Sequence, residues 1–266
     1  MYTAIATRNY RDPNKPRFES HYASTPTDFN GSTTIMTWNI KLSLSAEVII
    51  AELNHLKTSQ GAVDIVLLQD IDEIRVDQIA KQLAYNYIYF PISRHDQQQE
   101  NLGNAIITKW PFVKSEKLLL PYKNPLNDTI RGATKAMISI GGNNLLVYSV
   151  HMDTSFLSRA QQTTQIQTLL RDINTNCKQV IVGGDFNSLT SSDVINLDKL
   201  FRQIGLDRIS AEAGHTHKFW DVNFTFDHIY AKGISVVEVG VLQGTPIIDH
   251  FPLWAKTLPV HRFANK

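Results

Sequence analysis

A carboxylate and a carboxamide follow one of the most apolar runs in this sequence. The stretch reads Val180-Ile181-Val182-Gly183-Gly184-Asp185-Phe186-Asn187. Its β-branched residues predict a short buried strand, and the Gly-Gly pair lets the backbone turn where a Cβ would interfere. Because Asp185 and Asn187 alternate along the chain, both side chains are expected on one side, the first as a metal ligand or base and the second as a donor to an anion. The triplet alone also fits an ordinary Asx turn.

Residues of the same chemical types end the other apolar runs. They are Asn39, Asp70, His151 with Asp153, Asp227 with His228, and Asp249 with His250. Each of them alone fits a cap, a turn or a hydrogen-bonded surface imidazole. Their repetition at the ends of several predicted strands favours one shared site, in which carboxylates bind a cation and imidazoles transfer protons.

The elements that must position these residues follow from the hydrophobic periodicity. Strands are predicted at 34–40, 63–70, 86–90, 102–108, 113–120, 132–140, 145–151, from 180 onward, and at 224–230, 235–241 and 251–257. Helices are predicted at 46–57, 75–83, 157–174 and 192–204. Pro91 is expected to end a strand, and the glutamine-rich segment 93–101 is expected to be a loop. Residues 141–144 form a connection of hairpin length, so the strands around it are predicted to be antiparallel.

Length and composition fit one large α/β domain. The chain has 266 residues and 42% of them are hydrophobic, enough for a sizeable core. Residues 1–33 are polar and interrupted by prolines, so they are interpreted as an extended N-terminal arm, and residues 34–266 as one catalytic domain. Lys and Arg (26) nearly balance Asp and Glu (25), which excludes a general basic field that would attract nucleic acid.

The cysteine content limits the kinds of metal site. A single cysteine, Cys177, excludes an intramolecular disulfide and a cysteine-built site, so a metal here would have oxygen or imidazole ligands. No apolar run approaches the length of a membrane span, and residues 1–32 lack the apolar core of a signal peptide. A cytoplasmic location is the default expectation, and export with a signal absent from this chain is the alternative.

As an ordered set, these motifs resemble the endonuclease/exonuclease/phosphatase superfamily, which has the fold of deoxyribonuclease I. The matching stretches, within residues 34–257, are Thr37-Trp38-Asn39-Ile40, Leu68-Gln69-Asp70, Gly103-Asn104-Ala105, Ser149-Val150-His151, Arg159 with Gln162, Gly184-Asp185-Phe186-Asn187, Phe226-Asp227-His228-Ile229 and Asp249-His250-Phe251-Pro252. The resemblance implies a four-layer α/β sandwich of two facing mixed β-sheets with helices outside. It places the active site at one end of the sandwich.

The resemblance also implies phosphoester hydrolysis with a divalent cation, usually Mg²⁺, with Mn²⁺ as a substitute. The metal ligands implied are Asp70, Asn39 and Asp249. The catalytic residues implied are Asp185 and Asn187, which position the attacking water and the phosphate, His250 oriented by Asp227 as the acid/base, and His151 as a donor to a phosphate oxygen. Such chemistry needs a cation, a base and donors to the non-bridging oxygens, and this set supplies all three.

Two positions depart from the family pattern. Where the family usually has Gln-Glu, this chain has Gln69-Asp70, so the carboxylate is one methylene shorter. Where the family usually has Ser before Asp-His, this chain has Ile248, which removes a hydroxyl near the site. Neither change removes a charged group, so the hydrolase hypothesis is kept.

The substrate is left open among nucleic acid, a lipid head group and a small phosphate ester, and no stable protein partner is implied. Asn104 is assigned to substrate binding, as are His215 and His217 in the loop that is predicted at 207–223. The segments 93–101 and 122–131 are further candidates for substrate contact. The competing hypothesis from another class is a non-catalytic binding module that retains the fold.

Overall fold

Alternate residues of the central strands pack on opposite faces of each sheet in this computed structural model, which describes residues 7–24, 29, 31–95, 99–153, 158–243 and 249–259. In β3 (Thr33–Asn39), Ile35 packs between the two sheets, whereas Met36 and Trp38 pack against α1 (Ala46–Gln60) and α2 (Glu73–Leu83). Such two-sided burial is expected for a central strand that is covered by a packed layer on each face.

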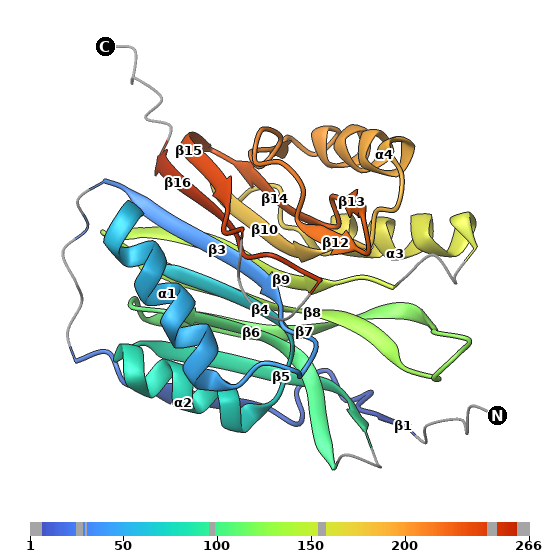
Figure 1. The fold of residues 1–266 in the computed structure, drawn as a ribbon, viewed down its shortest axis with the longest axis horizontal. Helices are drawn as coiled ribbons and strands as arrows, with labels where there is room; N and C mark the ends of the chain where they lie inside the picture. Colours follow the sequence, from blue (N-terminus) through green and yellow to red (C-terminus); the bar gives the residue numbers. More distant parts are fainter. Residues whose placement is uncertain are drawn as a thin grey trace.

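A third hydrophobic cluster lies on the outer face of the second sheet. It joins that sheet to α3 (Arg159–Asp172) and α4 (Ser191–Arg202). Three buried clusters therefore separate four layers, and the helices lie outside (Figure 1). The predicted four-layer α/β sandwich with two mixed sheets is confirmed.

The two large sheets have different strand orders. The first has the order β1 (Thr7–Asn9), β5 (Asn86–His95), β6 (Glu100–Thr108), β4 (Ile65–Ile71), β3, β16 (Leu253–Pro259), β15 (Ile234–Val241), with β2 (Phe18–His21) also paired to β5. The second has the order β11 (Asp207–Arg208), β14 (Asp227–Lys232), β10 (Gln179–Asp185), β9 (Asn143–His151), β8 (Ile130–Ile140), β7 (Phe112–Lys123). A separate hairpin joins β12 (His217–Phe219) to β13 (Val222–Phe224). Only β3–β4 and β9–β10 are parallel pairs among the strands described.

The predicted hairpin at 141–144 is confirmed. β7, β8 and β9 pair in antiparallel fashion, and Gly141-Gly142 joins the last two. Both glycines have positive φ, 54° and 80°. A two-residue hairpin turn requires this conformation, and glycine adopts it at the lowest cost.

The prediction that 93–101 is a loop is wrong at both ends. β5 continues to His95, and β6 begins at Glu100, so both strands extend through polar residues into a longer hairpin. Pro91 does not end β5, because the register shifts between Pro91 and Ser93. A bulge accommodates a residue that has no N–H to donate.

The N-terminal segment adds two short strands to the edge of the first sheet. β1 pairs with the end of β5 and β2 with its beginning. The side chain of Lys117 donates hydrogen bonds to the backbone oxygens of Tyr10 (3.2 Å) and Lys15 (2.8 Å), which attaches this segment to β7 as well. No helix among the described residues is long and apolar enough to cross a bilayer.

Gly184 brings β9 and β10 close together beside the residues that end them. A Cβ at this position would overlap the backbone oxygen of Val150. We expect Gly184→Ala to lower the free energy of unfolding by roughly 3 kcal/mol or more, because the backbone cannot move away without breaking the parallel pairing. Urea unfolding measures this change.

The matched control is Gly142→Ala in the exposed turn. No atom lies within 4 Å of a Cβ there, although φ is +80°. Its expected cost is about 1 kcal/mol, from the left-handed conformation alone. Equal losses of stability in the two variants would contradict the steric explanation.

Candidate active site

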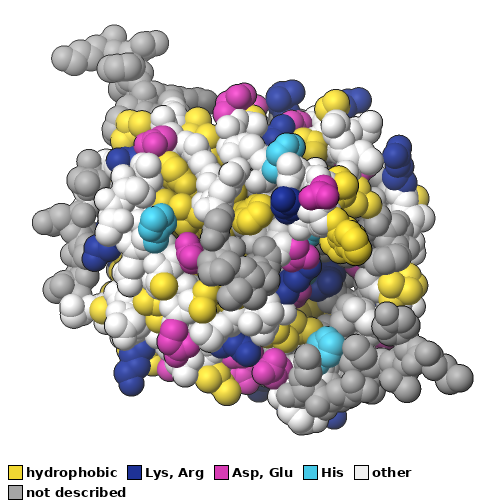
Figure 2. Space-filling view, in the orientation of Figure 1, with side chains coloured by type: hydrophobic (Ala, Val, Ile, Leu, Met, Phe, Trp, Pro, Cys, Tyr) yellow, Lys and Arg dark blue, Asp and Glu magenta, His cyan; other side chains and the backbone are white. Residues whose placement is uncertain are grey.

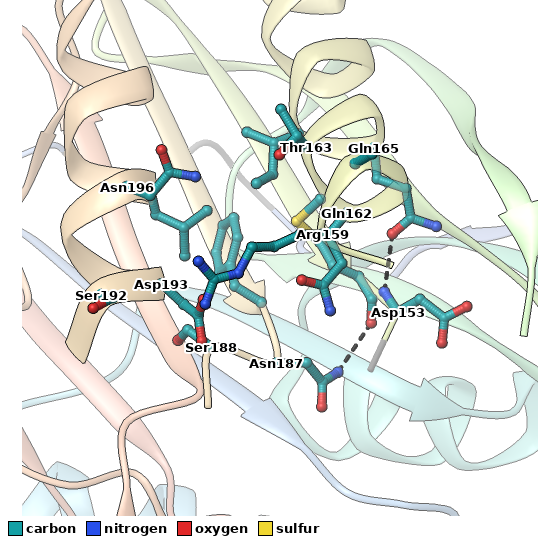
Figure 3. A pocket seen from close by; sticks show the side chains of 15 residues that line it. Asp153, Arg159, Gln162, Thr163, Gln165, Asn187, Ser188, Ser192, Asp193 and Asn196 are labelled. Carbon is teal, nitrogen blue, oxygen red and sulfur yellow. Dashed lines mark hydrogen bonds between the residues drawn. The ribbon is translucent and has the colours of Figure 1, made fainter. Parts of the chain in front are cut away.

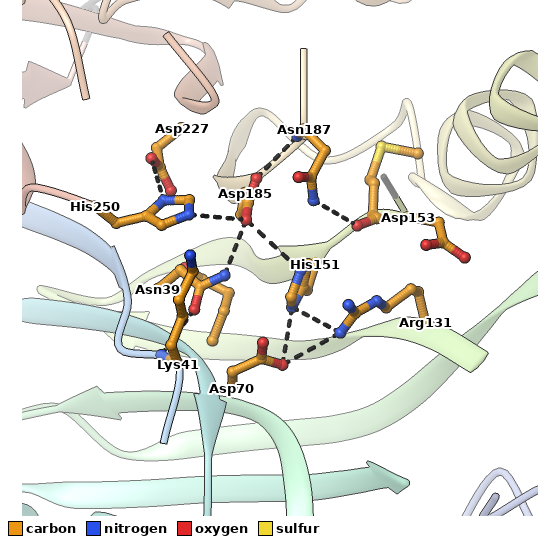
Figure 4. A network of polar contacts seen from close by, with 12 residues as sticks. Asn39, Lys41, Asp70, Arg131, His151, Asp153, Asp185, Asn187, Asp227 and His250 are labelled. Atoms are coloured by element: carbon orange, nitrogen blue, oxygen red, sulfur yellow. Dashed lines mark hydrogen bonds and ion pairs between the residues drawn. The ribbon is translucent and has the colours of Figure 1, made fainter. Parts of the chain in front are cut away.

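The polar strand ends meet at one end of the sandwich because of the strand directions. In the parallel pair β3–β4, Asn39 is the last residue of β3 and Asp70 the second-last of β4, and the parallel pair β9–β10 ends in His151 and Asp185. β14 runs the opposite way, so its first residue, Asp227, lies at the same end. His151, Asp185 and Asp227 are therefore cross-strand neighbours in one row of the second sheet (Figure 4).

The buried carboxylate of Asp185 lies at the centre of this group. Its Oδ2 accepts a hydrogen bond from Asn39 Nδ2 at 2.9 Å, and its Oδ1 accepts one from the backbone N–H of Asn187 at 2.8 Å. The Nε2 atoms of His151 and His250 lie 3.6 Å and 3.7 Å from the same Oδ2. Two imidazoles and a carboxamide therefore converge on one oxygen atom, from both sheets.

His250 and Asp227 form a buried pair. The ring Nδ1 of His250 lies 2.9 Å from Asp227 Oδ2. Burial works against the charged imidazole, but the carboxylates of Asp227 and Asp185 outweigh it and raise the pKa of His250 to about 9. Burial also raises the pKa of Asp227, with Asp185 acting in the same direction. Near neutral pH the proton accordingly lies on the imidazole, which can donate it to an anion.

The backbone around this pair is fixed by three further hydrogen bonds. The indole Nε1 of Trp38 donates to the backbone oxygen of His250 at 3.0 Å. Thr216 Oγ1 accepts from the backbone N–H groups of Phe226 and Asp227, both at 3.0 Å. These buried hydrogen bonds hold the imidazole and the carboxylate in a defined relative orientation.

Asp70 contacts two other residues of the site. Its Oδ1 lies 3.0 Å from His151 Nδ1 and 3.3 Å from a terminal nitrogen of Arg131. Burial opposes ionisation of Asp70, but His151 and Arg131 outweigh it and hold the pKa of this carboxyl well below its usual range. Asp70 itself is the bulged residue of β4, between Gln69 and Ile71, and has φ of 49°, a left-handed conformation that turns the side chain toward the second sheet.

Asp249 forms a second acidic position beside His250. Its carboxylate is paired with the ammonium group of Lys41 and lies 3.2 Å from His217 Nε2. Partial burial raises the pKa of Asp249, but its hydrogen bonds to His217 and Lys41 hold it well below the usual range. The His217 ring packs edge-on against the His250 ring, with a centroid distance of 4.6 Å.

The donor set fits a hard divalent cation. Asp70 and Asp249 are ionised and Asn39 adds a carboxamide oxygen, the ligand types that Mg²⁺ and Mn²⁺ prefer. Two groups of three residues also bring possible ligand atoms within 4.8 Å of one another, namely His217, Asp249 and His250, and Asp185, Asp227 and His250. Asp70 is in neither group among the residues described, so its role as a ligand stays a prediction.

The residues assigned to substrate binding differ in their surroundings. Asn104 is buried, and its Nδ2 donates to the backbone oxygen of Gly132 at 2.7 Å. His217 joins the site through Asp249, whereas His215 Nδ1 lies 3.4 Å from the hydroxyl oxygen of Thr225. Asn187 Nδ2 donates to the backbone oxygen of Met152 at 3.0 Å. These contacts place Asn187 and His217 at the site, and they give Asn104 a contact between β6 and β8.

Two cations of the site were not identified individually from the sequence. Arg131 lay only at the border of a loop candidate, and Lys41 follows Asn39 by two residues. The sequence signal for Lys41 was its position next to the strand-end residue Asn39, and the signal for Arg131 was its position at the start of a predicted strand. The position Ile248, singled out in the sequence, lies outside the described residues.

Comparison with known proteins agrees with this geometry. The sequence model of the Endonuclease/Exonuclease/phosphatase family matches residues 36–250, which contain every residue of the site. This chain belongs to the endonuclease/exonuclease/phosphatase family. Members of this family are generally hydrolases, and the family depends on divalent metals. No curated protein matches the chain by sequence.

Solved structures share the fold of this endonuclease/exonuclease/phosphatase family member. A family protein from Leptotrichia buccalis C-1013-b has a TM-score of 0.67 and 18% identity, covering 85% of this chain and 99% of its own. D. rerio TDP2, solved with a single-strand DNA product, has a TM-score of 0.67 and 16% identity, covering 86% of this chain and 99% of its own. A family protein from Beutenbergia cavernae DSM 12333 has a TM-score of 0.67 and 16% identity, covering 86% and 72%.

The pairing of His250 with Asp227 yields a prediction for the metal-free protein. Asp227→Asn removes a negative charge from the imidazole, so the pKa of His250 should fall from about 9 by roughly 1 to 3 units. NMR titration of the imidazole resonances measures this shift. Asp207→Asn, at an exposed carboxylate outside the site, is the control and should leave the titration unchanged. An unaltered His250 titration in Asp227→Asn would contradict the assigned pairing.

Proposed function

We propose that this chain is a divalent-metal-dependent phosphoesterase that hydrolyses a phosphodiester or a phosphomonoester. The observation that carries the proposal is the convergence of Asn39, His151 and His250 on one oxygen of Asp185, with Asp227 behind His250. A phosphoester is anionic, so its hydrolysis needs positive charge, directed donors and a group that transfers a proton. The site offers these groups within one polar cluster.

Each residue has a chemical role in this proposal. Asp70, Asn39 and Asp249 would hold Mg²⁺ or Mn²⁺, which when bound supplies positive charge for the phosphate oxygens. Asp185 and Asn187 orient the attacking water and the phosphate. His151 donates to a phosphate oxygen, and His250, held by Asp227, transfers the proton. Arg131, which contacts Asp70 and His151, adds positive charge on the same side.

The surface charge bears on the substrate class. On the face in Figure 2, Lys and Arg side chains are interspersed with Asp and Glu side chains among the residues described, without a broad basic stripe. A protein that binds along a long nucleic acid generally has such a stripe, which contacts the phosphate backbone. The D. rerio TDP2 relative nevertheless was solved with a single-strand DNA product, so a short nucleic acid stays a candidate beside a lipid head group and a small phosphate ester.

Hydrolysis of bis-p-nitrophenyl phosphate with Mg²⁺ or Mn²⁺ tests the proposal directly. His250→Ala and Asp185→Asn should each lower the rate by roughly 10²-fold or more, because each removes a group that moves a proton or orients the reaction. His55→Ala, at an exposed position of α1, is the matched control and should retain the full rate. Full turnover in either site variant would refute the roles assigned to it.

If the wild-type protein turns over none of plasmid DNA, RNA, sphingomyelin, inositol phosphates and the nitrophenyl ester, the result would favour the non-catalytic binding module. Phosphate release or nitrophenolate absorbance measures each reaction. Binding of the same compounds without turnover would then support the binding-module alternative.

The short carboxylate of Asp70 yields a separate prediction. Asp70→Glu restores the longer side chain that the family usually has, so half-maximal activity should need less Mg²⁺, by about threefold or more if the carboxylate reaches the cation directly. A titration of initial rate against Mg²⁺ concentration measures this. An unchanged or higher requirement would show that Asp70 does not limit metal binding.

A further inference from the structure

Arg131 lies at a break in the second sheet, although its guanidinium reaches two residues of the proposed active site (Figure 4). The register of β7 shifts between Leu119 and Lys123, so residues 120–122 of β7 face Arg131 alone. On the other side of β8, the ladder with β9 ends at the neighbouring Gly132. The pairing is therefore irregular or at its end on both sides of Arg131, so the position of this residue depends on contacts from outside these ladders.

One such contact comes from Asn9, the last residue of β1. Its Oδ1 accepts a hydrogen bond from the backbone N–H of Ile130 at 2.9 Å, and its Nδ2 donates to the backbone oxygen of Asp128 at 2.8 Å. The side-chain amide offers one acceptor and one donor, as the backbone of a neighbouring strand would. Because Arg131 directly follows Ile130, these bonds fix the backbone immediately before the guanidinium-bearing residue.

Asn9 is itself held by β5. It pairs with Ser93 in the β1–β5 ladder, and the hydroxyl of Ser93, which is 2% exposed, donates to Asn9 Oδ1 at 2.8 Å. The next backbone N–H, that of Tyr10, donates to the backbone oxygen of Ile92 at 2.9 Å. The Asn9 oxygen therefore accepts from Ser93 and from Ile130 at once, which uses both of its lone pairs and leaves the amide one orientation.

The other end of the same segment is attached to α3. Gln165 Nε2 donates to the backbone oxygen of Pro121 at 2.8 Å, and Gln165 Oε1 accepts from the backbone N–H of Asp153 at 3.1 Å (Figure 3). Asn124 Nδ2 donates to Asp153 Oδ1 at 2.7 Å. Gln165 and Asp153 also line a cavity of about 380 Å³ between α3 and α4. Segment 121–130 is therefore held by α3 at its beginning and by Asn9 at its end.

We propose that Asn9 is a positioning residue of the active site, which holds the start of β8 so that the Arg131 guanidinium stays beside Asp70. The inference rests on the proposed function for the role of Arg131, which adds positive charge on the side of the phosphate. It gives the N-terminal segment a part in the reaction, although this segment lies outside the residues that match the family, 36–250.

A double-variant cycle on the hydrolysis of bis-p-nitrophenyl phosphate tests the inference. Asn9→Ala should lower kcat/KM by roughly tenfold, because a displaced group loses its effect on the reaction steeply with distance. Arg131→Gln should lower it by at least as much, and adding Asn9→Ala to Arg131→Gln should cause no further loss, since the positioned group is already gone. Losses that multiply in the double variant, or a full rate in Asn9→Ala alone, would overturn the inference.

Asn14→Ala is the matched control, at an exposed Asn of the same N-terminal segment. It should keep the full rate, and urea unfolding should show that both single variants are folded at the assay temperature. A variant that only loosened the segment would lower the rate equally with and without Arg131, so the cycle separates a positioning role from general destabilisation. A loss in Asn14→Ala equal to that in Asn9→Ala would also overturn the inference.

NMR measures the same positioning without turnover, so the two proposals fail separately. In Asn9→Ala the Arg131 Nε–Hε group should gain picosecond-to-nanosecond motion, and the Ile130 amide should exchange its hydrogen about tenfold faster or more, because its acceptor is gone. Unchanged motion of Arg131 would overturn the inference. If no ester is hydrolysed but Arg131 becomes mobile, the phosphoesterase proposal fails and the positioning of Arg131 by Asn9 stands. If the ester is hydrolysed and the losses multiply, the opposite holds.

Discussion

The hydrogen bond from Asn39 to Asp185 joins the ends of strands that belong to different sheets, and the arrangement of the site depends on it. Both residues are almost completely buried. A shift of one sheet against the other would leave their polar atoms buried without a partner, which would destabilise the folded protein. Gln69 makes a similar bridge below them, donating to Ser149 Oγ at 3.0 Å across the same interface. The polar contacts between the sheets therefore fix their relative position at the end where the strand-terminal side chains meet.

Charge balance explains how so many carboxylates share this small volume. Asp70 contacts Arg131, Asp249 contacts Lys41, and Asp227 contacts His250. Among the residues described, Asp185 has a carboxamide and two imidazoles near its Oδ2 and no Lys or Arg paired with it. Like charges at such distances repel strongly in a buried site, so each partner cation lowers the cost of keeping the carboxylates ionised. A bound divalent cation would act in the same direction.

Much of the site followed from sequence because its residues end apolar strands. The β-branched run before Asp185 predicted a buried strand, and parallel pairs such as β3–β4 and β9–β10 bring their ends to one edge. The contact of Arg131 with Asp70 could not be predicted, because it depends on the register that sets Gly132 opposite His151. The pairing of Lys41 with Asp249 joins residues 208 positions apart and likewise needs the folded chain.

The error in predicting segment 93–101 as a loop has a related cause. The polar residues at the ends of β5 and β6 have the composition of a loop, yet they continue a hairpin in which Ser93 and Asn101 are buried and Arg94, His95 and Glu100 are partly exposed. Strand pairing there is set by the backbone and the neighbouring strand, and the hydrophobic pattern carries no signal of it. The cavity between α3 and α4 could not be predicted from the sequence either, because it arises from the spacing of two helices that follow different strands.

We propose that residues scattered along the chain form one cation-dependent hydrolytic centre. Anomalous diffraction from crystals grown with Mn²⁺ tests it most directly, because the ion is located without reference to any assumed ligand. We expect an anomalous peak within bonding distance of the carboxylate of Asp70, with Asn39 and Asp249 around it and His250 beside it. A peak at a distant surface site alone, or a peak whose ligands exclude Asp70, would contradict the account.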